Sequence, residues 1–353
     1  RPSRGAGTAD PLALGAQERG RGGAKRRGGG VSMAEAATAP AGLFERELPQ
    51  ADGVFLADEG ASAGYLAHTT SAFSDKWTAL EQADEDEEGW KRFQLRWYLD
   101  CYGYGSEGEL AQALKSRQRI LDAGCGPGHK AAWLARLAPH ATVIAMDLSE
   151  SIFLAERRYR DRPNMVFVKG DIAATPFRDG TFDLINCDQV LHHTDAPPST
   201  LAEFRRILAP GGALHTYVYA RKALPRELLD EHFREASKQL SSDELWALSE
   251  QLTRLGKALS ELDATIDVPD MPALGIKGGR MDVQRFLYWN FVKCFWNEEH
   301  GFEGSRMVNF DWYSPERAFR YDRDEFVAMV EKAGFAADFV HSEEACHSGR
   351  FRG

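Results

Sequence analysis

The stretch Arg119-Ile-Leu-Asp-Ala-Gly-Cys-Gly-Pro-Gly-His129 decides the fold of this chain. Its apolar start is typical of a buried strand, which ends in the acid Asp122. Three glycines follow at alternate positions, Gly124, Gly126 and Gly128. Glycines at this spacing allow a sharp backbone turn and let a ligand lie against the main chain. The helix-like run 130–137 follows, and its free N–H groups favour an electron-rich ligand, while the acid suits an ammonium group.

The next two predicted strands also end in acids. Strand 142–146 leads into Asp147, whose carboxylate can accept hydrogen bonds from two ribose hydroxyls. The third strand, from Met165, ends in Gly170-Asp-Ile172, which places a carboxylate and an apolar side chain where an adenine amino group and ring could bind. One such acid alone is often only a turn former or a helix cap. Three acids and a glycine loop at compatible strand ends instead indicate a nucleoside-binding site.

A fourth strand, 182–187, leads into Asp188-Gln-Val-Leu-His-His193. A helix at 200–208, the turn Ala209-Pro-Gly-Gly212 and a fifth strand at 213–219 follow. Alternating strand and helix patterns predict a parallel sheet with helices on both faces.

This order of motifs resembles the class I S-adenosylmethionine-dependent methyltransferases, closely over residues 117–219 and more loosely over 322–353. The resemblance implies an α/β fold with a doubly wound, Rossmann-like sheet of seven strands. A helical N-terminal cap and a helical, aromatic-rich insertion after strand five would complete it. The implied cofactor is S-adenosylmethionine, with S-adenosylhomocysteine as product. The implied reaction moves a methyl group to an O, N, C or S nucleophile of a small molecule.

The resemblance also assigns cofactor residues. Asp122 would lie near the methionine ammonium, the glycine loop would make room for the methionyl-ribosyl part, Asp147 would bind the ribose, and Asp171 with Ile172 would hold the adenine. The implied set is Asp122, Gly124, Cys125, Gly126, Gly128, Asp147, Leu148, Gly170, Asp171, Ile172, Cys187 and Asp188. The segment after strand four lines the cofactor and faces the acceptor, which makes Gln189 a candidate acceptor contact.

His192 and His193 are the candidate general bases, needed only if the acceptor must lose a proton. Adjacent residues cannot both point the same way, and a histidine here is often structural in the family. Material inserted after strand five overhangs the carboxyl edge of the sheet, so residues 221–321 are the candidate acceptor region. Helices are expected at 226–240 and 242–262, a Pro/Gly-rich turn at 268–279, and an aromatic run at 285–296.

The insertion closes on Asn309-Phe-Asp-Trp-Tyr-Ser-Pro315, which favours an ordered loop. Its polar and aromatic members Asp311, Trp312 and Tyr313 are the candidate acceptor contacts. The division expected is a disordered tail at 1–40, a cap with a lid at 41–116, a cofactor-binding core at 117–220, the acceptor insertion at 221–321, and the last helix and strands at 322–353. Residues 68–77 are the candidate lid.

Composition narrows the function classes. The net charge of −10 argues against nucleic acid as substrate. No run of eighteen apolar residues could span a membrane. The five cysteines show neither C-x-x-C pairs nor zinc spacing, so we expect no metal, no disulfide and a cytoplasmic location. Two alternatives stay open, namely another S-adenosylmethionine-using enzyme and a non-catalytic partner protein that keeps the fold. The sequence leaves the acceptor and the oligomeric state undecided.

Overall fold

The computed structural model describes residues 40–57, 87–315 and 317–353. The predicted tail up to residue 39 and the candidate lid at 68–77 lie outside these ranges. The five cysteines are buried and unpaired. None of the described helices is long and apolar enough to cross a membrane.

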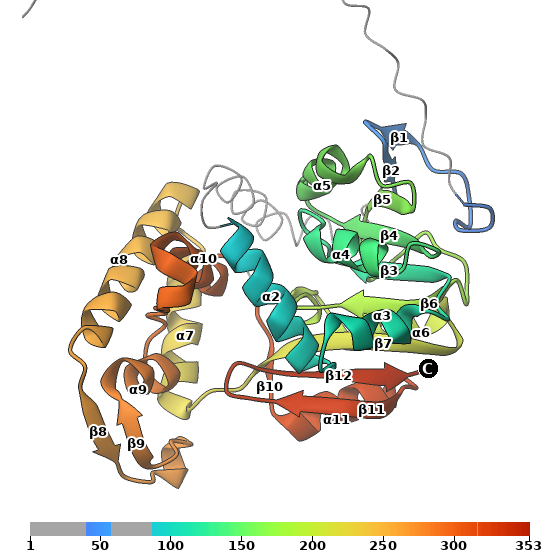
Figure 1. Cartoon of the computed structure of the whole chain (residues 1–353). Helices are drawn as coiled ribbons and strands as arrows, with labels where there is room; N and C mark the ends of the chain where they lie inside the picture. The colour runs from blue at the N-terminus through green and yellow to red at the C-terminus, as the bar shows by residue number, and fades with distance from the viewer. Residues whose placement is uncertain (1–39, 58–86, 316) are drawn as a thin grey trace, which may run out of the picture. The chain divides into compact units, whose positions relative to one another are not determined.

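The core is one sheet with the order β1-β2-β5-β4-β3-β6-β7-β12-β11, and β10 pairs with β7 (Figure 1). Its strands are β1 (Gln50–Ala51), β2 (Val54–Leu56), β3 (Arg119–Ala123), β4 (Thr142–Asp147), β5 (Met165–Lys169), β6 (Phe182–Cys187), β7 (Leu208–Ala220), β10 (Arg320–Tyr321), β11 (Ala336–Ser342) and β12 (Cys346–Arg352). From β2 to β7 neighbouring strands run parallel, whereas β12 is antiparallel to both β7 and β11. The doubly wound α/β prediction is confirmed, because the chain winds outward from β3 in both directions.

The expected strand count of seven is too low, since the sheet of the described residues has ten strands. Two additional strands come from the region predicted as a helical cap. At residues 50–56 the chain forms β1 and β2 instead of a helix, and β2 pairs with the edge strand β5. Residues 87–101 and 107–114 of the same region are helical, as predicted. Phe44 forms an isolated bridge to Phe177 in the connection between β5 and β6, and their rings stack with centroids 5.7 Å apart. A short apolar segment beside an open parallel edge gains more from pairing than from a helix turn of its own.

Successive strand residues point into two different cores. Ile120 belongs to the core under α2 (Glu87–Cys101), α3 (Glu107–Leu114), α4 (His129–Leu137) and α5 (Ser151–Tyr159), and Leu121 to the core under α6 (Pro197–Ile207) and α11 (Arg323–Lys332). Both side chains are fully buried. This burial on both faces explains the continuous apolar runs of the parallel strands.

The insertion contains the helices α7 (Leu224–Ser237), α8 (Ser242–Ser260), α9 (Val283–Asn290) and α10 (Gly301–Tyr313), with the hairpin β8 (Thr265–Val268) and β9 (Gly279–Asp282) (Figure 1). The two helices predicted at its start are present within a few residues. Ser241 and Glu244 form a capping box that starts α8. The predicted Pro/Gly-rich turn is the loop of the hairpin, in which Gly275 adopts a φ of 68°.

One prediction about the insertion is corrected, and the structure adds a feature that was not predicted. The loop expected around Asp311 is wrong, because residues 311–313 are the last turn of α10. A buried ion pair also holds the insertion together: Arg226 Nε donates to Asp230 Oδ2 at 2.6 Å, and Tyr313 Oη donates to Asp230 Oδ1 at 2.9 Å. Arg226 and Asp230 are 1% and 0% exposed.

Candidate active site

One cavity of about 580 Å³ lies at the carboxyl ends of the strands. The loops after β3, β4, β5 and β6 form one part of its lining, and the insertion with the end of β7 forms the other. We call these the cofactor end and the acceptor end. Its volume is in the range of small-molecule sites. Because the carboxyl ends of parallel strands share one edge, segments far apart in sequence meet there.

The glycine loop is built as its spacing predicts. Gly124, Gly126 and Gly128 all have positive φ, between 53° and 84°. A Cβ on Gly124 would lie 2.5 Å from the side chain of Val190, so the first position has no room for another residue. The N–H of Gly126 donates to Asp147 Oδ2 at 2.7 Å, which joins the loop to the end of β4. Gly128 does not line the cavity and instead packs against α5.

Asp147 is a fixed carboxylate at the cofactor end. Besides Gly126 it accepts from the Ser149 N–H at 2.8 Å and from Ser149 Oγ at 2.6 Å. Burial raises its pKa, and these donors oppose that effect. Two carboxylate oxygens have about four acceptor sites, so three bonds leave capacity for a ligand hydroxyl.

Asp122 and Asp171 each keep one buried oxygen without a hydrogen-bond partner in the described part of the chain. The other Asp122 oxygen accepts from Asn186 Nδ2 at 2.7 Å, and the other Asp171 oxygen accepts from the Ala173 N–H at 2.8 Å. Burial raises the pKa of Asp122 to about 6, although the Asn186 hydrogen bond opposes this shift. A buried carboxylate oxygen with no donor is costly, and a ligand with N–H groups removes that cost.

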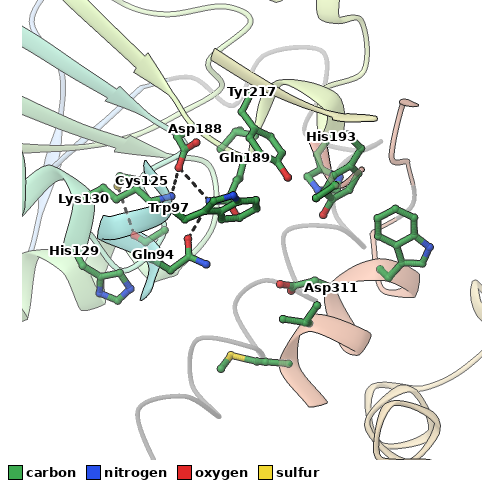
Figure 2. A pocket seen from close by; sticks show the side chains of 18 of the residues that line it. Gln94, Trp97, Cys125, His129, Lys130, Asp188, Gln189, His193, Tyr217 and Asp311 are labelled. Carbon is green, nitrogen blue, oxygen red and sulfur yellow. Dashed lines mark hydrogen bonds and ion pairs between the residues drawn. The ribbon is translucent and has the colours of Figure 1, made fainter. Parts of the chain in front are cut away.

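Asp188 is the centre of a polar network (Figure 2). It forms an ion pair with Lys130, accepts from Tyr102 Oη at 2.8 Å, and accepts from Gln189 Nε2 at 3.1 Å. Gln189 also donates to Gln94 on α2 at 2.9 Å and adopts a φ of 64°. The backbone at Gln189 is strained for a residue with a Cβ, and strain of this kind concentrates at functional sites.

The structure separates the two histidines. His193 lines the cavity, and its Nδ1 lies 2.8 Å from the Arg317 carbonyl. Because a carbonyl only accepts, Nδ1 carries the hydrogen and the ring lone pair is on Nε2. His192 lies outside the lining, is fully buried and packs against the ring of Tyr219 at 3.9 Å. Burial lowers the pKa of His192 well below its usual value, so it is neutral.

The acceptor end combines aromatic rings with cations. Asp311 and Trp312 line it, and Figure 2 shows Asp311 on α10 beside the lining side chains. Tyr313 does not line the cavity, because its side chain turns to Asp230 and its hydroxyl donates to that carboxylate. Other aromatic members of the lining are Tyr217, Tyr219, Tyr288, Trp289 and Phe295.

Most of the predicted site residues meet at this cavity. Those in its lining are Asp122, Gly124, Cys125, Gly126, Asp147, Leu148, Gly170, Asp171, Ile172, Asp188, Gln189, His193, Asp311 and Trp312. Those outside it are Gly128, Cys187, His192 and Tyr313.

The sequence reasoning missed several lining residues, namely Gln94 and Trp97 on α2, Lys130, Tyr217, Tyr219, Lys222 and Lys293. A signal existed for the tyrosines, since residues 217 and 219 alternate at the carboxyl end of the fifth strand and so share one face. Lys293 stands among aromatic residues in the run 285–296, which also contains Arg285.

Asp147→Ala is expected to weaken S-adenosylmethionine binding by about 1.5–3 kcal/mol, the range for losing charge-assisted hydrogen bonds. The control Ser149→Ala removes one donor to the same carboxylate and should have a smaller effect. Calorimetry on the folded variants measures both. Unchanged affinity in Asp147→Ala would exclude this residue from the cofactor site.

Comparison with known proteins shows what the central part of the chain is similar to. Residues 121–216 match the model of a methyltransferase domain. An uncharacterized protein of Synechococcus sp. is 43% identical over 136 residues, covering 36% of this chain and 31% of the relative. An uncharacterized methyltransferase of Schizosaccharomyces pombe is 35% identical over 123 residues, covering 32% and 43%. A malonyl-[acyl-carrier protein] O-methyltransferase of Legionella pneumophila is 36% identical over 108 residues, covering 30% and 38%.

The chain thus spans between 31% and 43% of the length of these curated relatives. The matched residues hold the glycine loop and the acids at the ends of β3, β4 and β5. Residues 121–216 are therefore a methyltransferase domain of the class I S-adenosylmethionine-dependent type, whose cofactor is S-adenosylmethionine.

Proposed function

We propose that this protein transfers a methyl group from S-adenosylmethionine to a small-molecule acceptor that binds at the acceptor end of the cavity. The observation that carries the proposal is the continuity of the cavity, in which one lining joins the glycine loop to the aromatic side chains of the insertion. A donor and an acceptor held in one cavity can reach the in-line geometry that methyl transfer requires.

The residues present fit the cofactor. The orphaned oxygen of Asp122 suits the methionine ammonium, and that of Asp171 suits the adenine amino group. Asp147 retains acceptor capacity for the ribose hydroxyls, and the positive φ of Gly124 brings bare main chain to the cavity. When bound, the cofactor supplies a methyl group on a positively charged sulfur, which needs no covalent help from the protein.

The chain's own residues supply position and proton transfer. The aromatic side chains of the acceptor end exclude water and orient the acceptor. His193 Nε2 accepts the proton of an acceptor that must lose one. The network around Asp188 fixes α2 against the loop after β6, which sets the width of the cavity between the two ends.

Incubation with S-adenosylmethionine and a panel of small acceptors, with detection of released S-adenosylhomocysteine, tests the proposal. The expected result is acceptor-dependent release together with cofactor binding in the micromolar range, about −7 to −9 kcal/mol. Binding without release for any acceptor would favour a non-catalytic partner protein. A product that carries a group other than methyl would favour a different S-adenosylmethionine-using enzyme.

Cofactor affinity should depend on pH through Asp122. Its pKa is about 6 in the ligand-free protein, so the carboxylate is ionised above this pH and protonated below it. An ammonium ligand binds the ionised form, so affinity should fall about tenfold per pH unit as the pH drops below 6. Asp122→Asn should bind more weakly at pH 7.5 and show a flatter profile. A wild-type profile flat from pH 5 to 7.5 would contradict the ammonium assignment.

A further inference from the structure

Lys293 places a buried ammonium group in the wall of the acceptor end. Its side chain lines the cavity, and the residue is only 4% exposed. Nζ donates one hydrogen bond, to Tyr288 Oη at 3.1 Å. Among the described residues no ion pair joins it to a carboxylate. An ammonium has three donors, so two of the three have no protein partner within the described ranges.

Aromatic rings surround this ammonium group but do not replace a counter-ion. Nζ lies 4.6 Å from the ring centroid of Trp312, 5.0 Å from that of Tyr288 and 5.6 Å from that of Phe295. A cation–π contact contributes about 2 kcal/mol when desolvated. Asp230 and Asp311 lie near enough to favour the charged form of Lys293, but neither is in an ion pair with it among the described residues. Burying a charge without a direct partner costs more than the cation–π contact contributes, so an oxyanion at this point would be stabilising.

Trp312 provides a second unused donor at the same place. Its Nε1 is buried and has no hydrogen-bond partner in the described part of the protein, and the residue is 4% exposed. The side chain belongs to the same lining as Lys293. Two unsatisfied N–H donors beside one cavity match a ligand with an oxyanion, which can accept from both.

Neighbouring cations strengthen the positive potential at this point. Lys222 Nζ lies 5.2 Å from the ring centroid of Trp289 and donates to three carbonyls, those of Glu344, of Ala220 at 2.8 Å and of Ala345 at 3.2 Å. Its donors are therefore used, whereas its charge still acts across the cavity. Burial lowers the pKa of Lys222 and of Lys293 to about 7, and Arg226 contributes to both shifts.

We propose that the methyl acceptor is a planar, conjugated organic acid whose oxyanion is bound by Lys293 Nζ and Trp312 Nε1. Its ring or conjugated system lies among the aromatic side chains of the acceptor end. This inference deepens the proposed function and rests on it, because the bound acid is taken to be the acceptor. The cavity also holds the cofactor, so the acid, or the part of it that enters, is small.

Binding of 2-naphthoate and of the matched neutral 2-naphthamide tests the charge requirement. Each is titrated into the full chain and followed by tryptophan fluorescence, with and without S-adenosylhomocysteine. The carboxylate is expected to bind at least about tenfold more tightly than the amide, because a hydrogen bond to a charged group is worth about 1.5–3 kcal/mol. Lys293→Met should abolish this preference, and Lys293→Arg should keep part of it.

Two further variants separate the donors from general effects. Trp312→Phe keeps an aromatic ring but removes Nε1–H, and it should reduce the preference for the carboxylate without abolishing it. Lys257→Met is the matched control. Lys257 lies in the same insertion, 5.6 Å from the ring of Trp296, but it is exposed, paired with Glu261 and outside the lining. Its removal should leave the preference unchanged.

The same titrations at different pH values give an independent readout. An anion binds the protonated lysine, so naphthoate affinity should fall as the pH rises through about 7 to 8.5, and Lys293→Met should lose this dependence. The other charged and titratable groups that face or neighbour Lys293 are Lys222, Arg226, Asp230, Arg285, Tyr288, Cys294, Asp311 and Tyr313. Among these only Lys222 shares a pKa of about 7, and Lys222→Met tests its part in the slope.

The outcomes distinguish this inference from the proposed function. Equal binding of acid and amide, binding of neither probe, or an undiminished preference in Lys293→Met would overturn the inference, and S-adenosylmethionine binding and methyl transfer would still stand. Selective naphthoate binding by a protein that does not bind S-adenosylmethionine would support the anion site. The same result would contradict the proposed function.

Discussion

Replacing His193 by alanine is expected to lower the turnover number by about 10²- to 10⁴-fold, the range for losing a positioned general base. His193 lines the cavity, and its bond to the Arg317 carbonyl leaves the ring lone pair on Nε2. The variant should bind S-adenosylmethionine as tightly as the wild type, because the cofactor contacts proposed above lie on other residues. Single-turnover kinetics with the acceptor found by the release screen measure the effect on the chemical step.

The neighbouring histidine offers the control for this experiment. His192 is neutral, fully buried and outside the lining. His192→Phe keeps a ring of similar size against Tyr219 and removes only one weak contact, 3.4 Å from Nδ1 to the Tyr217 carbonyl. Its turnover should stay close to that of the wild type. Near-full activity in His193→Ala would show that positioning alone accelerates the reaction, as for an acceptor that is already deprotonated.

Replacing Asp230 by alanine is expected to lower the free energy of unfolding by about 3–5 kcal/mol. The change leaves the Arg226 guanidinium buried without its carboxylate, and it also removes the acceptor of the Tyr313 hydroxyl. Arg226 is 1% exposed, so water cannot take the place of Asp230 without a structural opening. Chemical denaturation of the variant and the wild type measures the difference.

An exposed ion pair of the same insertion provides the comparison for this loss of unfolding free energy. Arg254 and Glu250 form an i,i+4 pair on α8, with a distance of 2.7 Å. Glu250→Ala should cost only about 0.3–0.5 kcal/mol, because solvent already screens that interaction. The double change Arg226→Met with Asp230→Leu should recover most of the loss, since an apolar pair of similar volume often matches a buried ion pair. A cost below about 1 kcal/mol for Asp230→Ala would mean that Arg226 finds another partner.

The cofactor end could be predicted from the sequence because its information is local. The glycine spacing, the acid before it and the acids at later strand ends are each read within a few residues. Once the strands pair in parallel, their carboxyl ends necessarily lie at one edge of the sheet. The positive φ of all three glycines, and the cavity positions of Asp122, Asp147 and Asp171, agree with that reading.

The acceptor end could not be predicted in the same way, because its members come from four separate elements. Lys222 follows β7, Tyr288 is on α9, Lys293 is in the connection after it, and Trp312 is on α10. Whether each of these side chains faces the cavity or a neighbouring helix depends on how the insertion helices pack. Tyr313 shows this, since it adjoins Trp312 in sequence but turns to the Arg226–Asp230 pair.

The sequence by itself determined the fold class, the succession of the five core strands along the chain, and the glycine loop and acids that line one end of the cavity. Tertiary structure alone decided that β1 and β2 extend the sheet, that His193 rather than His192 reaches the cavity, and that Lys293 is buried with no ion pair to any described residue. The physical reason is the separation along the chain of the residues that interact. Turn geometry and strand periodicity act between neighbours in the chain, whereas edge pairing, side-chain burial and charge compensation depend on segments that meet only after folding.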